Sequence, residues 1–165
     1  MVHNNADREQ FVNAMRGVAS SVCVVTTDGI AGRHGATVSA FCSVSADPPT
    51  ILVCLHGSSR IASCVRENGS FAVNVLPSDA AKIADRFAGS HDETVRDRFD
   101  GLCINEGQPH IDGATHLVCE LVNAIAANTH LICVGRVTSI KIRTASPLTY
   151  LAGKYGKICE SEILV

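Results

Sequence analysis

Long apolar runs and basic clusters are both missing from this chain. No uninterrupted apolar stretch approaches the ~18 residues that a membrane-spanning helix requires. Fourteen Lys and Arg residues against 16 Asp and Glu residues give a formal net charge of -2, and no block of like charges occurs. Without a basic patch, the chain lacks the long-range field that attracts a phosphate backbone. The sequence therefore predicts no membrane span and no nucleic-acid partner.

The common metal and catalytic motifs are also missing. The chain contains no CxxC, HExxH, GxSxG or Walker sequence, and no GxGxxG follows a strand. The seven histidines show no i, i+2 or i, i+4 pair, so we predict no metal site. No two of the eight cysteines lie closer than ten residues, which excludes a zinc or redox pair. Four cysteines lie in apolar, strand-like runs, where reduced thiols behave as small hydrophobes: Cys23, Cys54, Cys119 and Cys133.

The composition predicts a folded protein of one domain over residues 1–165. Hydrophobic residues make up 46% of the chain and charged residues 18%, and the mean hydropathy is +0.19. These values are too apolar for a disordered chain. Asp7, Arg8, Glu9 and Gln10 occupy positions where a secretory signal would need an apolar core. We therefore expect a cytoplasmic protein.

The first half of the chain shows helix and strand signals in turn. Asp7 and Gln10 resemble a capping box, and apolar residues then recur at helical spacing up to residue 19. Runs rich in β-branched residues at 21–27, 34–45 and 50–56 predict three successive strands. A helix over 60–68 would begin at the caps Ser58 and Ser59 and end at Gly69.

The second half predicts more strands. Residues 70–76 read as a strand that Pro77 stops, and residues 78–87 as a helix with a serine cap and Gly89 at its end. The polar stretch 90–113 has only a weak helical pattern near 94–99, so we expect an excursion outside the core. Two long β-rich runs, 115–127 and 129–143, are separated only by Asn128. The pattern predicts a mainly β fold with short helices, built as a six-stranded antiparallel closed or half-closed barrel.

Two segments have the character of ligand surfaces. In residues 35–45, Thr37, Ser39, Ser43 and Ser45 fall at alternate or near-alternate positions, so a strand would present a hydroxyl-lined face to a polar heterocycle. An ordinary solvent-facing strand would show the same pattern.

The second segment, residues 56–63, ends a strand and opens a helix. Ser58, Ser59 and Arg60 combine hydroxyls, a guanidinium and the free N–H groups of a helix start, which together suit a phosphate. A plain serine cap beside a surface arginine would explain the same residues.

Taken together, these segments resemble the flavin reductase-like proteins, split-barrel flavin-binding proteins known as reductase components of two-component flavin-dependent monooxygenases. The resemblance extends from about Phe11 to Tyr155. The order and spacing of the matching stretches carry it: FVNAMRGVASSVCVVTT, GATVSAFCSVS, DPPTILVCL, SSR, GSFAVNVL, RFAG and PLTYLAGKY.

The resemblance implies a six-stranded antiparallel split β-barrel that forms a homodimer with flavin near the subunit boundary. It places the flavin ring against the strand that contains Thr37, Val38, Ser39 and Ala40, with Cys54 and Leu55 on the next strand. It places the flavin phosphate at the SSR segment. The remaining residues that it assigns to the cofactor site are Phe87 and Tyr150.

One departure concerns the candidate catalytic residue, His130. The family often carries Gly-Asp-His at this point, whereas this chain has Asn128 and Thr129 before the histidine. Asn128 is able to adopt the left-handed conformation that glycine would provide. Thr129 supplies no carboxylate to fix the tautomer of the imidazole.

The implied activity is the reduction of FMN or FAD by NADH or NADPH, with the reduced flavin passed to a separate oxygenase. Because the two cofactors perform the hydride transfer themselves, the protein needs to orient them and requires no acid–base pair. With no tryptophan and few other aromatics, the flavin faces would be covered mainly by aliphatic side chains. Two alternatives are a non-catalytic flavin- or haem-binding barrel and an oxidase-like member of the pyridoxamine-phosphate-oxidase group, which should have a more basic phosphate site.

Overall fold

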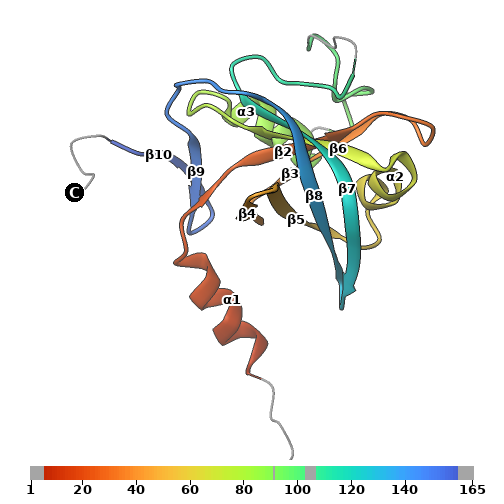
Figure 1. Cartoon of the computed structure of the whole chain (residues 1–165). Coiled ribbons are helices and arrows are strands. Elements are labelled where there is room, and N and C mark those ends of the chain that lie inside the picture. Colours follow the sequence, from red (N-terminus) through yellow and green to blue (C-terminus); the bar gives the residue numbers. More distant parts are fainter. Residues whose placement is uncertain (1–5, 91, 103–106, 160–165) are drawn as a thin grey trace, which may run out of the picture.

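The computed structural model describes residues 6–90, 92–102 and 107–159, and these contain three helices and ten strands (Figure 1). Their order is α1 (Arg8–Arg16), β1 (Ser20–Ser21), β2 (Cys23–Thr27), β3 (His34–Val38), β4 (Phe41–Ala46), β5 (Pro49–His56), α2 (Arg60–Asn68), β6 (Ser70–Val75), α3 (Ala81–Ala88), β7 (Thr115–Ala127), β8 (His130–Lys141), β9 (Leu148–Leu151) and β10 (Lys154–Lys157). The mainly β class with short helices is confirmed. No helix among the described residues is long and apolar enough to span a membrane.

The strands form two antiparallel sheets. The larger has seven strands in the order β3-β2-β6-β7-β8-β5-β4, and the smaller has the order β1-β9-β10. The large sheet curls until its two ends approach each other, where the Cys54 N–H donates to the Ala40 carbonyl at 3.0 Å. Within the described ranges no strand ladder joins β3 to β4 or β5, so the barrel is not closed.

The predicted count of six strands is wrong for two reasons. The run 34–45 breaks at Ser39 and Ala40 into β3 and β4, which pair with different neighbours, β2 and β5. The C-terminal residues add β9 and β10, which pair with β1 in a sheet of their own. The break between β3 and β4 matters for function because it forms one wall of the candidate site.

Helices α1 and α2 begin where their capping residues predict. The Asp7 carboxylate accepts the Gln10 N–H at 3.0 Å. Ser59 caps α2, and Gly69 ends it in the left-handed conformation that favours glycine. Helix α1 extends away from the sheets and buries none of its residues (Figure 1).

Helix α3 begins later than its serine predicts. Its N-cap is Ala80, whose side chain has no acceptor and makes no capping bond. Ser78 lies two residues earlier, and its N–H donates to the Ser146 carbonyl at 2.8 Å. The predicted serine cap is therefore wrong. Gly89 ends the helix in the left-handed conformation, as expected.

The described part of 90–113 contains turns and neither helix nor strand, so the weak helical pattern near 94–99 forms no helix. The expectation that it lies outside the core is wrong. Phe99 and Ile111 are buried and pack in the same cluster as Phe87 and Leu76. The excursion therefore completes the smaller of two apolar cores.

The larger core lies inside the curled sheet and under α2. It is built mainly from aliphatic side chains and Phe71, and it includes Cys23, Cys119 and Cys133. Burial raises the pKa of Cys23 and Cys119 to about 12, so both thiols stay neutral. The seven described cysteines are free thiols, of which Cys42 and Cys159 are exposed.

Strands β7 and β8 form the long hairpin that the sequence predicts. Asn128 lies at its tip with a φ of 50°, which confirms the left-handed conformation expected there. The hairpin brings His130, the first residue of β8, opposite His56 at the end of β5. This register places two histidines at one end of the sheet.

Candidate functional site

A groove of about 320 Å³ lies where β3 and β5 approach each other, and we call it the β3–β5 groove. Its lining residues are Ala36, Thr37, Val38, Ser39, Ala40, Cys54, Leu55, His56, Ser59, Ile61 and His130. The structure thus brings together eight predicted site residues from strands β3, β5 and β8 and from the connections that precede β4 and α2. It does not place Ser58, Arg60, Phe87 or Tyr150 in this groove.

The turn between β3 and β4 supplies polar groups at one wall. The backbone N–H groups of Ser39 and Ala40 and the Ser39 hydroxyl make no hydrogen bond within the described residues, so they are available as donors. The Thr37 hydroxyl is already used, because it donates to the Ala84 carbonyl at 2.7 Å. Thr37 therefore anchors β3 to α3, and the free N–H donors at this wall come from the turn.

The predicted hydroxyl face is only partly present. Ser43 and Ser45 lie on β4, separated by a β-bulge, and neither lines the groove. The Ser45 hydroxyl is held in a local turn with Asp47. The alternation fails because the chain changes strands at Ser39, so residues before and after this point do not share a face.

The opposite wall of the groove is formed by β5 and is apolar, and Cys54 lies on it. Burial, and then the neighbouring Cys42, raises the pKa of its thiol, so the sulfur stays neutral near pH 7. Leu55 is buried and belongs to the larger core. This wall supplies shape and apolar contact, and no nucleophile.

The start of α2 closes one end of the groove. The Ser59 hydroxyl donates to the His56 carbonyl at 2.6 Å and accepts from the Ala62 N–H. Ser58 lies beside it and bonds the His56 Nδ1 at 3.0 Å. Arg60 lines an adjoining pocket of about 380 Å³, together with Arg33, Arg96 and Arg98; we call it the arginine pocket.

Two histidines form the rim of the groove. His56 and His130 are paired across β5 and β8, and their rings meet edge-on with centroids 5.4 Å apart. The Thr129 hydroxyl lies 2.9 Å from the His130 Nδ1. A threonine thus orients this ring where the family pattern has an aspartate. Sequence reasoning missed His56, because a lone histidine at a strand end carries no motif.

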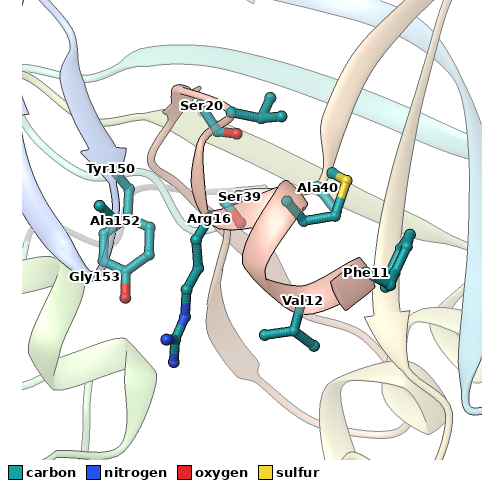
Figure 2. A pocket seen from close by; sticks show the side chains of 11 residues that line it. Phe11, Val12, Arg16, Ser20, Ser39, Ala40, Tyr150, Ala152 and Gly153 are labelled. Atoms are coloured by element: carbon teal, nitrogen blue, oxygen red, sulfur yellow. The ribbon is translucent and has the colours of Figure 1, made fainter. Parts of the chain in front are cut away.

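Tyr150 lies on β9 and lines two further cavities. One, of about 190 Å³, is shared with Thr37, Val38, Ser39 and Tyr155, and so continues from the β3–β5 groove. The other, of about 570 Å³, lies between α1 and the turn at residues 39–40. Figure 2 shows Arg16 between the helix and Tyr150 in that cavity. Tyr150 therefore lies beside the groove at the junction with α1.

Phe87 is not brought into any described cavity. It is 1% exposed, and its ring meets Phe99 edge-on with centroids 5.0 Å apart. A Cβ on Gly35 would come within 2.7 Å of the Phe87 ring, so the two elements are closely packed. Phe87 therefore packs against β3 and does not line the site.

Metal ligands do not gather in the described residues: no group of three or more His, Cys, Asp or Glu side chains is placed to hold a metal ion. What the site does offer is a narrow groove with free backbone donors, a capped helix start at one end and arginines beyond it. A groove with these features is suited to a flat, polar ring compound that carries an anionic group.

The particular family follows from sequence comparison. The family described as "Flavin reductase like domain" matches residues 15–158, and this chain belongs to it.

Individual relatives agree with this assignment. The chain is 34% identical over 150 residues to FMN reductase (NADH) RutF of Pseudomonas syringae pv. syringae, covering 88% of this chain and 83% of the relative. It is also 34% identical over 137 residues to the 4-hydroxyphenylacetate 3-monooxygenase reductase component of Salmonella typhimurium, covering 81% of each. The solved structure of flavin reductase PheA2 in its native state superposes with a TM-score of 0.85 at 32% identity, covering 94% of this chain and 100% of that one.

Proposed function

We propose that this protein is an NADH-dependent flavin reductase that supplies reduced flavin to a separate monooxygenase. The observation that carries the proposal is the β3–β5 groove, whose free donors at Ser39 and Ala40 lie at one wall and whose helix start lies at one end. The relatives are named for NADH, for flavin and for monooxygenases, which supports the same activity.

The residues of the groove fit a flavin. Val38, Ala40, Cys54 and Ile61 give it an apolar lining suited to a ring face, while the backbone N–H groups at the turn suit the ring's polar edge. A flavin phosphate would lie at the start of α2, where Ser58, Ser59 and Arg60 favour an anion. When bound, flavin supplies the hydride-accepting ring and NADH or NADPH supplies the hydride.

The chain's own contribution is positioning. The Ser39 and Ala40 donors would hold the ring edge and stabilise negative charge that develops there. His130, whose Nδ1 is held by the Thr129 hydroxyl, would present its Nε2 at the rim, where the nicotinamide must approach. Tyr150 would contact the ring from β9, and Phe87 would act through the packing of β3.

The wider assignments are proposals of the same kind. We propose one flavin reductase-like domain over residues 1–165, in which the curled sheet forms a split barrel, and a cytoplasmic location. The flavin is FMN or FAD, and a separate oxygenase receives the reduced flavin.

We also propose a homodimer, because α1 stands off the sheets with Phe11 60% and Met15 50% exposed. A stable dimer should bury more than ~1,200 Å² in total. Sedimentation at micromolar concentration with flavin present tests this, and a monomer would contradict it.

The activity is tested by mixing purified protein with NADH and flavin and following absorbance at the nicotinamide band. Turnover supports a reductase. Tight flavin binding without turnover would contradict the proposal and favour a flavin-storage or sensor protein of the same fold.

A further inference from the structure

The arginine pocket adjoins the β3–β5 groove at the start of α2. Four arginines from three separate segments line it: Arg33 before β3, Arg60 at the first position of α2, and Arg96 and Arg98 in the connection after α3. The proposed flavin site uses only one of these four arginines, Arg60. These four arginines line one cavity of about 380 Å³, although the net charge of the chain is -2.

Two of the arginines are neutralised by carboxylates of the same pocket. Arg98 forms an ion pair with Asp92 at 2.5 Å, and Arg33 forms one with Asp97 at 3.0 Å. Asp92 and Asp97 are the acidic residues among those that line the pocket. Arg33 also lies over the Phe99 ring, 4.9 Å from its centroid, which fixes it further. These two ion pairs occupy both acidic side chains of the pocket.

The other two arginines remain unmatched. Arg60 and Arg96 are exposed, and their guanidinium groups make no hydrogen bond or ion pair within the part of the chain that the structure describes. The charge of Arg60 also acts on His34, which lines the same pocket. Burial lowers the pKa of His34, and the charges of Arg98 and Arg60 lower it further, against the opposite effect of Asp92. The pocket therefore has a positive potential and two guanidiniums free to bind an anion.

A single flavin phosphate accounts for Arg60 but leaves Arg96 without a partner. Guanidinium groups bind phosphate through paired N–H donors, and the arginine pocket shares no lining residue with the β3–β5 groove, so it offers room for a second phosphate beyond Arg60. We propose that the arginine pocket binds the second, adenylate-side phosphate of a dinucleotide, with Arg96 as its principal ligand. This inference rests on the proposed function, which places the first phosphate at Arg60. FAD and the dinucleotide hydride donor both carry such a phosphate.

Direct binding tests the pocket without any need for turnover. ADP is titrated calorimetrically into the full chain, into Arg96→Gln and into the control Arg66→Gln, an exposed arginine at the far end of α2. Loss of a charge-assisted contact should weaken ADP binding about tenfold or more in Arg96→Gln and less than twofold in Arg66→Gln. Added salt should weaken ADP binding to the unchanged chain. Equal ADP affinity in all three proteins, or no ADP binding to the unchanged chain, would overturn the proposal even if the reductase activity is present.

Steady-state kinetics identify which dinucleotide uses the pocket. If FAD is the source, Arg96→Gln should raise the KM for FAD about tenfold more than the KM for FMN. If the donor is the source, it should raise the KM for NADH about tenfold more than that for reduced nicotinamide mononucleotide. A variant that changes neither ratio would overturn the proposal. A protein that oxidises no NADH with any flavin would instead refute the proposed function, while the ADP titration would still report on the pocket.

Discussion

Acid should destabilise the fold through one buried histidine, His116 on β7, which is 8% exposed. Its Nδ1 lies 2.9 Å from the Asn74 Oδ1, which also accepts the Ile111 N–H. Because the Ile111 N–H is able only to donate, it fixes Oδ1 as the acceptor, so His116 must carry its proton on Nδ1. The Asn74 amide nitrogen donates to the Val24 carbonyl and to Thr26. The neutral ring thus completes the hydrogen bonds of the Asn74 amide.

The magnitude follows from the pKa of His116. Burial, and then the nearby His110 and Lys141, lowers the pKa from 6.5 to about 4 in the folded protein. The unfolded chain therefore binds more protons between these values, and stability falls as the pH falls from about 6.5 to about 4. Linkage gives a loss of about 2 kcal/mol at pH 5 and about 3 kcal/mol in full.

Urea unfolding followed by circular dichroism at pH 7.5 and pH 5 measures this loss. Other groups also titrate in this range, so the test is the difference between variants. His116→Gln should reduce the drop between the two pH values by about 2 kcal/mol, whatever its stability at pH 7.5. His56→Gln, which changes an exposed histidine, should keep the wild-type drop. An unchanged drop in His116→Gln would refute the reasoning.

Two further substitutions test the site and the core. Arg60→Glu should weaken FMN binding by about 2–4 kcal/mol, because a charge-assisted contact is lost and repulsion is added; in fluorescence titrations riboflavin should lose much less, and equal losses would show that Arg60 does not contact the phosphate. Gly135→Ala should destabilise the fold by about 1–3 kcal/mol in urea unfolding, since its Cβ would come within 2.5 Å of the Phe71 ring. Gly57→Ala, whose Cβ would meet nothing closer than 3.4 Å, is the matched control, and an equally stable Gly135→Ala would contradict the close packing.

Features set by neighbouring residues were predictable from the sequence. The Asp7 and Ser59 caps, the end of α2 at Gly69 and the turn at Asn128 all depend on local backbone chemistry, and the structure has each of them. The serine cap of α3 failed because the helix begins only at Ala81, after Ser78 has paired its N–H with Ser146, a residue far along the chain. A local signal does not report such a tertiary competitor.

The candidate site was predictable only in part, for the same reason. Ser39 and Ala40 could be assigned to the site by resemblance, but the break that exposes their N–H groups depends on the separate partners of β3 and β4. His56 enters the site through its register with His130. The arginine pocket joins segments more than 25 residues apart, such as Arg33 and Arg60, which no motif links.

The central claim is that flavin is a substrate that this protein reduces and releases. It is tested on protein stripped of flavin, with NADH fixed and free flavin varied far above the protein concentration, while initial NADH oxidation is recorded. Release predicts a rate that rises hyperbolically with flavin. A micromolar constant would correspond to about -8 kcal/mol of binding, weak enough for dissociation during turnover. A rate that saturates once flavin equals protein, or no NADH oxidation at all, would contradict the account.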